Sequence, residues 1–333
     1  MTLKWGIAAA GKISQDFANA VNTLNEYDHK LVAVAARDLG RAEEFAKKFG
    51  VAKAYGSYLE LAKDPNVEIV YVGTLNPQHF EVATLMLENG KHVLVEKPLC
   101  LNEKQAHKLI TYAERKKLFL MEAIWSRFFP SYQYARKQIE NGTLGDIQSV
   151  EVEFGFCGLD DVDRLSKKDL GGGTVLDLGV YVIQACQWAF QQAPKSIKAT
   201  GTLNDEGVDL EMSAEINYGD NKVGKIKTSA VKTLNNTFKI VGTKGQITIP
   251  SFWCPPSLID IDGTEKQWPL PEAKHEFNFI NSCGLSYEAE EVRKCIRDGK
   301  KESEKVTHNE SLLIAHIEDE IRKQIGVKYL EDD

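Results

Sequence analysis

A chain of 333 residues, of which 43% are hydrophobic, is long enough to form two globular domains with sizeable cores. Its formal net charge of −7 argues against nucleic acid as a partner, because phosphate binding requires a basic surface. We find no run of about 18 apolar residues, so no membrane-spanning segment is expected.

The N-terminal residues lead directly into a strand-like run and show none of the segments of a signal peptide. The six cysteines are scattered and contain no C-x-x-C pair. We therefore expect a cytoplasmic protein with free thiols and no metal site.

The first 122 residues alternate between short apolar runs, typical of buried parallel strands, and longer amphipathic runs typical of helices. This alternation predicts a doubly wound parallel sheet, so residues 1–122 are assigned to a dinucleotide-binding Rossmann domain. The expected strands are 3–9, 30–36, 67–73, 92–98 and 118–121, and a short segment at 54–56 leads to a helix. The expected helices are 12–24, 41–49, 57–64, 78–89 and 102–117.

A turn of small residues joins the first strand to the first helix. A dinucleotide fingerprint has three glycines here, which allow a tight turn and close approach of a pyrophosphate. Only the central glycine is present, as Gly11, while Ala9 and Ser14 occupy the outer positions. These side chains are small enough to predict a dinucleotide site formed with Lys12 and Ile13, although an ordinary tight turn is the alternative.

The second strand ends in Arg37 and Asp38, with Arg41 one helical turn later. An acidic residue at this position binds the ribose 2′-hydroxyl of NAD, whereas arginine suits the 2′-phosphate of NADP. We therefore expect NADP, held by Arg37 and Arg41. Asp38 leaves the strictness of that preference open, and a solvated helix start is the structural alternative.

The fourth strand is followed by a loop in which Thr74 and Asn76 are placed to line a nicotinamide site. His79 follows that loop at the start of a helix and is a further candidate for contact with the cofactor. The next strand ends in Glu96-Lys97-Pro98, and ligands of open α/β sheets bind at the carboxyl ends of strands. Lys97 is therefore expected at the edge of a cleft.

Residues 123–333 show a different pattern and are assigned to a substrate-binding and dimerisation domain. Consecutive strand-like runs joined by short turns predict an open, mainly antiparallel sheet with one face available to a partner. The expected strands are 147–156, 196–203, 208–218, 223–230, 237–241 and 246–249, and helices are expected at 130–140, 174–190, 285–297 and 308–325.

Three glycines precede the predicted helix at 174–190, and Thr174 is a plausible cap for it. Asp177 and Tyr181 are four residues apart and share one helix face. A carboxylate and a phenol on one face form a candidate catalytic site. The alternative is a purely structural role, with Asp177 serving the helix dipole and Tyr181 packing in the core.

The Gly-Ala turn, Glu96-Lys97-Pro98, and Gly172-Gly173 followed by Asp177-x-Gly179-x-Tyr181 resemble the Gfo/Idh/MocA oxidoreductase family over nearly the whole chain. Most members end the last motif with histidine, where this chain has Tyr181. A branch that oxidises dihydrodiols and aldose sugars is more similar still, through residues 35–38, 120–125, 127–130, 241–245 and 286–289.

The resemblance implies NADP as cofactor, no metal, and a homodimer built largely through the open sheet face. It implies a small-molecule substrate, a dihydrodiol or an aldose sugar, with Lys97 and Tyr181 as the catalytic pair. It also implies that the substrate pocket is lined by Trp125, Phe154, Asp177, Tyr181, Trp253 and Phe279, and that Glu96 and Lys97 contact the cofactor. Two other functions remain open at this point: an inositol-type sugar dehydrogenase and a non-catalytic NADP-binding sensor.

Overall fold

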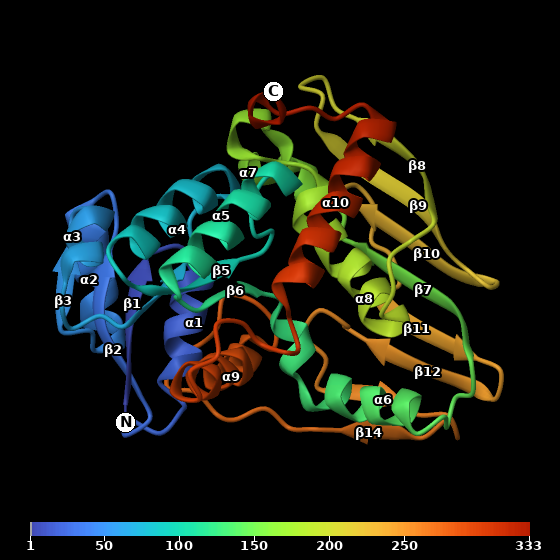
Figure 1. The fold of residues 1–333 in the computed structure, drawn as a ribbon, viewed down its shortest axis with the longest axis horizontal. Helices are drawn as coiled ribbons and strands as arrows, with labels where there is room; N and C mark the ends of the chain where they lie inside the picture. The colour runs from blue at the N-terminus through green and yellow to red at the C-terminus, as the bar shows by residue number, and fades with distance from the viewer. Residues whose placement is uncertain (1) are drawn as a thin grey trace. The chain divides into compact units, whose positions relative to one another are not determined.

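The computed structural model describes residues 2–333, which form two compact units (Figure 1). Unit 1 comprises residues 2–99, 105–128 and 269–308, and unit 2 comprises residues 100–104, 129–268 and 309–333. The sequence predicts a single boundary after residue 122. In the structure, residues 269–308 instead pack with the first unit, and the five residues Cys100–Lys104 pack with the second.

Unit 1 is built on the predicted parallel sheet, with strand order β3-β2-β1-β4-β5-β6. Its strands are β1 (Leu3–Ala8), β2 (His29–Ala35), β3 (Lys53–Tyr55), β4 (Ile69–Val72), β5 (His92–Glu96) and β6 (Leu120–Ala123). Its helices are α1 (Lys12–Val21), α2 (Leu39–Phe49), α3 (Tyr58–Lys63), α4 (His79–Glu88), α5 (Glu103–Lys116) and α9 (Leu285–Arg297). The predicted Rossmann fold is confirmed.

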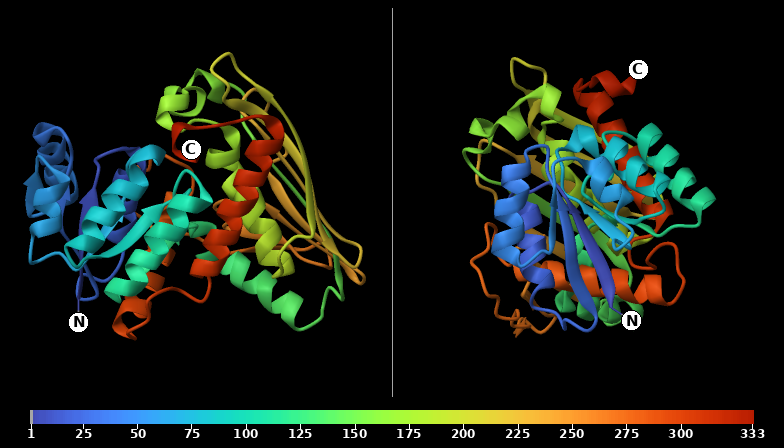
Figure 2. Two further views of the ribbon diagram at one scale, coloured as in Figure 1. Left: turned by 45° about the horizontal axis from the view of Figure 1, so that its top comes forward. Right: turned by 90° about the vertical axis from the view of Figure 1, so that its left-hand side faces the viewer.

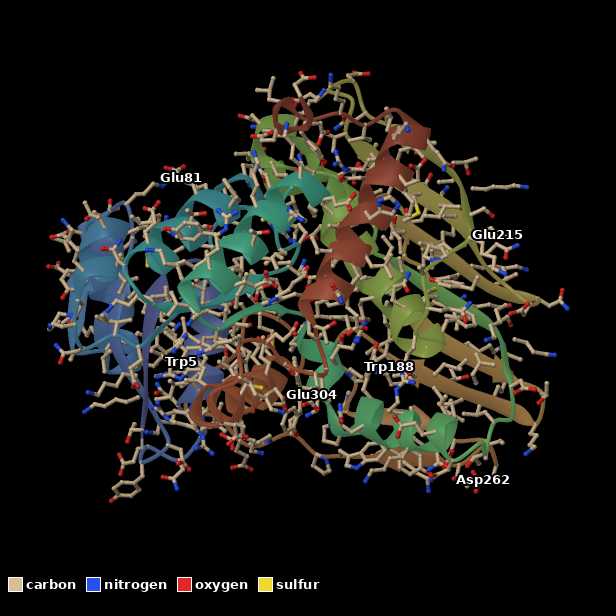
Figure 3. All side chains as sticks on the ribbon, in the orientation of Figure 1. Trp5, Glu81, Trp188, Glu215, Asp262 and Glu304 are labelled. Atoms are coloured by element: carbon tan, nitrogen blue, oxygen red, sulfur yellow. The ribbon has the colours of Figure 1, made fainter. Side chains whose placement is uncertain are left out.

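Aromatic side chains fill the layer between this sheet and α1. Trp5 of β1, labelled in Figure 3, is completely buried and packs edge-on against Phe17 of α1 at 5.2 Å between ring centroids. Phe17 also stacks on Tyr71 of β4 at 3.9 Å. Helices α2 and α9 pack against α1, and the returning segment is therefore part of the same core.

Unit 2 is built on an eight-stranded sheet with order β14-β13-β12-β11-β7-β10-β9-β8. Its strands are β7 (Ile147–Gly155), β8 (Ser196–Leu203), β9 (Asp209–Gly219), β10 (Lys222–Ser229), β11 (Thr237–Gly242), β12 (Gly245–Pro250), β13 (Ser257–Ile259) and β14 (Glu265–Gln267). The pairing is antiparallel except between β7 and β10, which run parallel. The mainly antiparallel character is confirmed. The short strands β13 and β14 had no signal in the sequence.

Helices cover one face of the unit 2 sheet and leave the other uncovered (Figure 2). The helices of this unit are α6 (Pro130–Glu140), α7 (Asp163–Ser166), α8 (Val180–Phe190) and α10 (His308–Ile325). Trp188 of α8 is buried, whereas Glu215 of β9 is exposed at the outer side of the sheet (Figure 3). No helix among residues 2–333 combines the length and apolar character that a membrane span requires.

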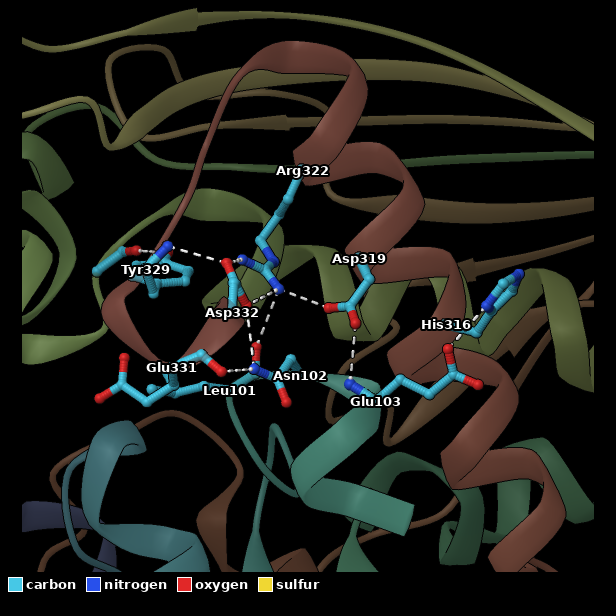
Figure 4. Close-up of polar contacts among 10 residues, drawn as sticks. Leu101, Asn102, Glu103, His316, Asp319, Arg322, Tyr329, Glu331 and Asp332 are labelled. Carbon is cyan, nitrogen blue, oxygen red and sulfur yellow. Dashed lines mark hydrogen bonds and ion pairs between the residues drawn. The ribbon is translucent and has the colours of Figure 1, made fainter. Parts of the chain in front are cut away.

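The short segment after Leu99 is fixed to α10 by a polar network (Figure 4). The buried Arg322 donates to Leu101 O at 3.3 Å and forms ion pairs with Asp319 and Asp332. Asn102 Nδ2 donates to Asp332 Oδ1 at 3.0 Å. These contacts explain why the segment belongs to unit 2, although the residues just before it, up to Leu99, belong to unit 1.

Candidate active site

The first strand of unit 1 ends in a tight turn that opens at the N-terminus of α1. Ala9 has φ +86°, a conformation uncommon for a residue with a side chain, and Gly11 precedes the helix in an extended conformation. A side chain at Gly11 would meet no other atom within 4 Å. The turn therefore leaves open space in front of free helix N–H groups, which is the arrangement that binds a pyrophosphate.

Close packing of α1 on the sheet is supplied from the strand side. A Cβ at Gly73, directly after β4, would lie 2.4 Å from Ser14 Oγ, so a larger residue would not fit there. Gly73 therefore allows the close packing of helix on strand that the third glycine of the fingerprint usually provides. Ser14 Oγ and Thr74 Oγ1 are buried and have no hydrogen-bond partner within the described chain. Two such oxygens beside the turn fit a polar ligand, so the residues present suit a dinucleotide.

Arg37 and Arg41 are exposed at the end of β2, and their charges act on a common neighbour. Burial raises the pKa of Tyr58, while Arg37 and Arg41 both oppose that rise. Asp38 caps α2, because its Oδ1 accepts from Arg41 N at 3.0 Å. The acidic side chain is thus engaged with the helix, and both guanidinium groups lie close enough to Tyr58 for their charges to act on it.

His79 is 1% exposed, and both of its ring nitrogens face backbone carbonyls. Nδ1 lies 2.8 Å from Pro98 O and Nε2 lies 3.2 Å from Thr74 O. Burial lowers its pKa to about 4, so the ring is neutral near pH 7. His79 therefore joins the loop after β4 to the peptide after Lys97, and any effect on a cofactor passes through those two segments.

Lys97 is half-buried directly after β5, and its peptide bond to Pro98 is cis. The preceding Glu96 is 8% exposed and accepts from Tyr71 Oη at 2.5 Å. Leu99 N donates to Glu122 Oε1 of β6 at 2.9 Å. Buried carboxylates thus hold the chain on both sides of Lys97.

Glu288 of α9 is a third buried carboxyl group in this unit. It is completely buried, and neither of its carboxyl oxygens has a hydrogen-bond partner among the described residues. Burial raises its pKa well above the ordinary value, and the charge of Glu96 raises it further. Glu288 lies in the first turn of α9, but its side chain is buried in the interior of unit 1 and not exposed at the helix N-terminus.

Two predicted pocket residues belong to unit 1 and differ in exposure. Trp125 is 5% exposed in the 3₁₀ turn Trp125–Phe128, whereas Phe279 is 43% exposed on the loop before α9. Asn76, the remaining candidate from the loop after β4, begins the 3₁₀ turn Asn76–Gln78. Trp125 is thus buried and Asn76 half-buried, and Phe279 is the most exposed of the three.

In unit 2, the helix that carries Asp177 and Tyr181 begins differently from the prediction. The expected cap by Thr174 is wrong: its side chain donates instead to Asp209 Oδ2 at 2.7 Å. The same oxygen accepts from Val175 N at 2.7 Å. Gly173 has φ +123°, and a Cβ there would lie 2.4 Å from Asp209 Oδ1. The buried Asp209 therefore anchors this helix start.

Asp177 lies in a π-helical turn, Val175–Gly179, that leads directly into α8. Its side chain forms an ion pair with Arg164 of α7 at 2.8 Å. Asp177 is 7% exposed, and its backbone N–H donates to Gly173 O at 3.2 Å. Arg164 therefore holds the carboxylate, and the bond to Gly173 O holds the backbone of the same residue. Arg164 was not identified from the sequence.

Tyr181 follows in the first turn of α8 and is 7% exposed. Its ring meets Phe154 of β7 edge-on at 5.6 Å, and Phe154 stacks on Trp253 at 4.6 Å. The structure thus brings three predicted site residues together into one aromatic cluster beside Asp177. Such a cluster suits a flat apolar ligand with a polar group directed at the phenol.

The missed residues Arg164 and Asp209 share one property: each binds a partner outside its own local motif. Asp209 is 35 positions from Thr174, and Arg164 is 13 positions from Asp177. No local motif marks these two residues.

Two family models match this chain in succession. The first, described as "Oxidoreductase family, NAD-binding Rossmann fold", covers residues 3–124, and the second, "GFO/IDH/MocA C-terminal domain", covers residues 132–248. The chain belongs to the Gfo/Idh/MocA family. The family resemblance predicted from the sequence is confirmed. The chain is an oxidoreductase whose fold binds a nicotinamide dinucleotide.

Among relatives in this family, trans-1,2-dihydrobenzene-1,2-diol dehydrogenase of Danio rerio is 44% identical over 334 residues, covering 100% of this chain and 99% of the relative. The enzyme of the same name from Homo sapiens is 43% identical over 334 residues, again covering 100% and 99%.

Solved structures of lower identity share the Gfo/Idh/MocA fold. A 3-ketoreductase from Actinomadura kijaniata, in complex with NADP and TDP-benzene, has a TM-score of 0.82 at 23% identity over 99% of this chain and 100% of its own. Levoglucosan dehydrogenase, in complex with NADH and levoglucosan, has a TM-score of 0.83 at 20% identity over 98% of both chains. At these identities the structures establish the fold alone.

Proposed function

We propose that this chain is an NADP-dependent dehydrogenase that oxidises trans-1,2-dihydrobenzene-1,2-diol to catechol and D-xylose to D-xylonolactone. The single observation that carries the proposal is the buried Tyr181, edge-on to Phe154 and close in sequence to the ion-paired Asp177. Full-length identity of 44% to an enzyme named for the dihydrodiol supports it. Activity towards D-xylose rests on the sequence resemblance.

The preference for NADP is supported by the two arginines after β2. A guanidinium pairs bidentately with a phosphate, and the charges of Arg37 and Arg41 both act on Tyr58. Asp38 is engaged as the cap of α2 and is poorly placed to bind a ribose hydroxyl. The turn at Ala9, Gly11, Lys12 and Ile13 would hold the pyrophosphate, with Thr74, Asn76 and Glu96 nearer the reactive ring.

In the proposed reaction, Tyr181 Oη accepts the proton of the substrate hydroxyl as the carbinol carbon gives up its hydride. When bound, the nicotinamide supplies the hydride acceptor. A free tyrosine titrates near pH 10, so a neighbouring cation is needed to stabilise the phenolate near neutral pH. We assign that role to Lys97. Asp177, held by Arg164, orients the substrate hydroxyls.

The aromatic cluster is proposed as the substrate pocket. Phe154 and Trp253 supply flat apolar surface next to Tyr181, and Trp125 and Phe279 are assigned to the same pocket. The oxidised dihydrodiol is a hydroxydienone, which gains aromaticity when it tautomerises to catechol. The proposed chemistry therefore requires no second active site.

We also propose a homodimer formed through the uncovered face of the unit 2 sheet. This face has a shallow cavity of about 600 Å³ lined by side chains of both charges. Glu151 and Glu153 of β7 lie beside Lys225 and Lys227 of β10, so the surface can be complementary to a second copy of itself. A monomeric wild type in sedimentation velocity would contradict this dimer.

Two alternatives remain. Another sugar or polyol dehydrogenase is favoured by the fold shared with levoglucosan dehydrogenase, although tyrosine replaces the usual histidine at position 181. A non-catalytic NADP sensor is disfavoured, because a sensor has no need of a proton-transfer pair.

Initial-rate measurements test the proposal. Purified protein is assayed for NADPH formation with trans-1,2-dihydrobenzene-1,2-diol or D-xylose, using NADP⁺ and, in parallel, NAD⁺. Turnover of the dihydrodiol with NADP⁺ is expected. Tight NADP⁺ binding without turnover of either substrate would favour another sugar or the sensor.

A further inference from the structure

Helix α1 presents a polar stripe to a loop that comes from the far end of the sequence. Lys12, Asp16 and Asn19 are spaced i, i+4 and i+7 and therefore lie on one face of the helix. Asn278 Nδ2 donates to Lys12 O at 3.2 Å, and Asn19 Nδ2 donates to His275 O at 2.7 Å. The stripe thus holds the loop 275–279, which belongs to the same unit.

Asp16 makes the central and strongest of these contacts. Its Oδ1 accepts from Asn278 N at 2.8 Å and from Asn278 Nδ2 at 2.7 Å. Its Oδ2 accepts from Phe279 N at 2.9 Å. The residue is 1% exposed, so these three bonds to a charged acceptor form away from bulk water. One carboxylate therefore fixes the backbone at both Asn278 and Phe279.

The loop held in this way exposes apolar side chains. Phe279 is 43% exposed and Ile280 is 61% exposed. Among residues 2–333 they are the only two large exposed hydrophobic residues adjacent in sequence. Two adjacent exposed apolar side chains on a backbone held by three hydrogen bonds form an apolar surface of the kind that binds a ligand.

The position of the loop relates this exposed ring to the cofactor. Asp16 lies five residues after Gly11, and Lys12, which also contacts the loop, begins the helix. The ring is therefore attached to the element whose N-terminus would hold the pyrophosphate.

We propose that Asp16 is a positioning residue that fixes Phe279 as an aromatic wall for the ring of the substrate. This inference rests on the proposed function, which assigns Phe279 to the substrate pocket and a flat dihydrodiol to that pocket. It adds that the dinucleotide-binding helix itself, through Asp16, sets the affinity for the aromatic ring.

The experiment measures catechol binding to the protein–NADPH complex by isothermal titration calorimetry, so that its readout is independent of turnover. Asp16→Ala is expected to raise the Kd of catechol about 10-fold, the effect of losing one to two hydrogen bonds to a charged acceptor. The Kd of NADPH is expected to stay unchanged, because Asp16 faces the loop. Asn19→Ala is the matched control: it cuts a bond to the same loop at His275 and should leave catechol binding near that of the wild type.

Two further variants, Phe279→Ala and the double variant Phe279→Ala with Asp16→Ala, test whether Asp16 acts by positioning Phe279 or by stabilising the fold in general. If Asp16 acts through Phe279, the double variant binds catechol no more weakly than Phe279→Ala alone. Fully additive losses would overturn the proposal, and so would an unchanged Kd in Asp16→Ala. If Asp16→Ala fails to fold, Asp16→Asn is measured in its place, because the amide cannot accept all three of these hydrogen bonds. A raised Kd of catechol in Asp16→Asn would then support the proposal, and an unchanged Kd would overturn it.

Failure of the proposed function is distinguishable from failure of this inference. A wild type that binds catechol in an Asp16-dependent manner but does not oxidise the dihydrodiol would contradict the reaction and support the aromatic wall. A wild type that binds no catechol would overturn the aromatic wall as well.

Discussion

Arg164 Nη1 donates to Asp177 Oδ1 at 2.8 Å and thereby connects α7 to the π-helical turn just before Tyr181. The side chain of Arg164 is 43% exposed, whereas that of Asp177 is 10% exposed. A partly exposed pair of this kind contributes little to stability. Its consequence is geometric: the direction of the Asp177 carboxylate is fixed from outside the helix.

Replacing Arg164 with methionine should therefore affect catalysis more than folding. We expect kcat/KM for the dihydrodiol to fall about 10-fold, the effect of roughly 1.4 kcal/mol of lost orientation. The melting temperature and the Kd of NADP⁺ should change little. Lys167→Met on the neighbouring turn is the control, because Lys167 pairs with Asp163 and not with Asp177. Equal losses in both variants would remove the orienting role.

Arg37→Ala should weaken binding of NADP⁺ and leave binding of NAD⁺ nearly unchanged. The expected rise in the Kd of NADP⁺ is about 10- to 100-fold, because a charge-assisted pair with the 2′-phosphate is lost. Titration calorimetry with both cofactors gives the comparison. Equal losses for NADP⁺ and NAD⁺ would show that Arg37 does not bind the phosphate.

Stability should fall as the pH decreases from about 6.5 to 4. Burial lowers the pKa of His79 from 6.5 to about 4, and burial with the charge of Lys301 lowers that of His92 to about 4. The unfolded chain binds these protons first, so the stability from neutral histidine is complete above pH 6.5 and is lost as the pH falls through the folded pKa.

His79→Asn isolates this contribution. The variant should be less stable at pH 7, because an amide cannot reproduce the contact with both Pro98 O and Thr74 O. Its melting temperature should nevertheless depend less on pH between 6.5 and 4. A slope equal to that of the wild type would contradict the assignment to His79.

Glu288→Gln should stabilise the protein at neutral pH. Burial raises the pKa of Glu288 in the folded state, so its contribution is complete below the ordinary value of 4.5 and is lost as the pH rises towards the folded value. The amide of glutamine does not ionise, so the variant does not lose stability in this way as the pH rises, and its side chain fills nearly the same volume. Thermal unfolding between pH 4.5 and 8 measures it, with Glu291→Gln as the control, since Glu291 is bound by Lys305 and Ser303. A lower melting temperature in Glu288→Gln at pH 8 would show that the charged form is needed.

The sequence predicts the fold well where the pattern is local. The run at 92–98 identifies β5, and helix α9 begins and ends at the predicted residues. Prediction fails where a long-range contact decides the structure. Thr174 was expected to cap a helix, but Asp209 from a distant strand instead accepts from the Thr174 hydroxyl and from Val175 N.

The same contrast between local patterns and long-range contacts holds for the candidate site. Phe154 and Trp253 were assigned to one pocket with Tyr181, and the structure brings these three together. Arg164 and Asp16 act on residues that only folding brings near, so neither could be identified from a motif. The parallel pairing of β7 with β10 was likewise hidden, because strand direction depends on the intervening connection.

The most direct test of the central claim compares Tyr181→Phe with the wild type, using trans-1,2-dihydrobenzene-1,2-diol and NADP⁺. The substitution keeps the ring that packs on Phe154 and removes only the hydroxyl group. We predict that kcat falls by about 100- to 10,000-fold, the range for loss of a general base, while the Kd of NADP⁺ is unchanged. Turnover close to that of the wild type would contradict the assignment of Tyr181 as the proton acceptor.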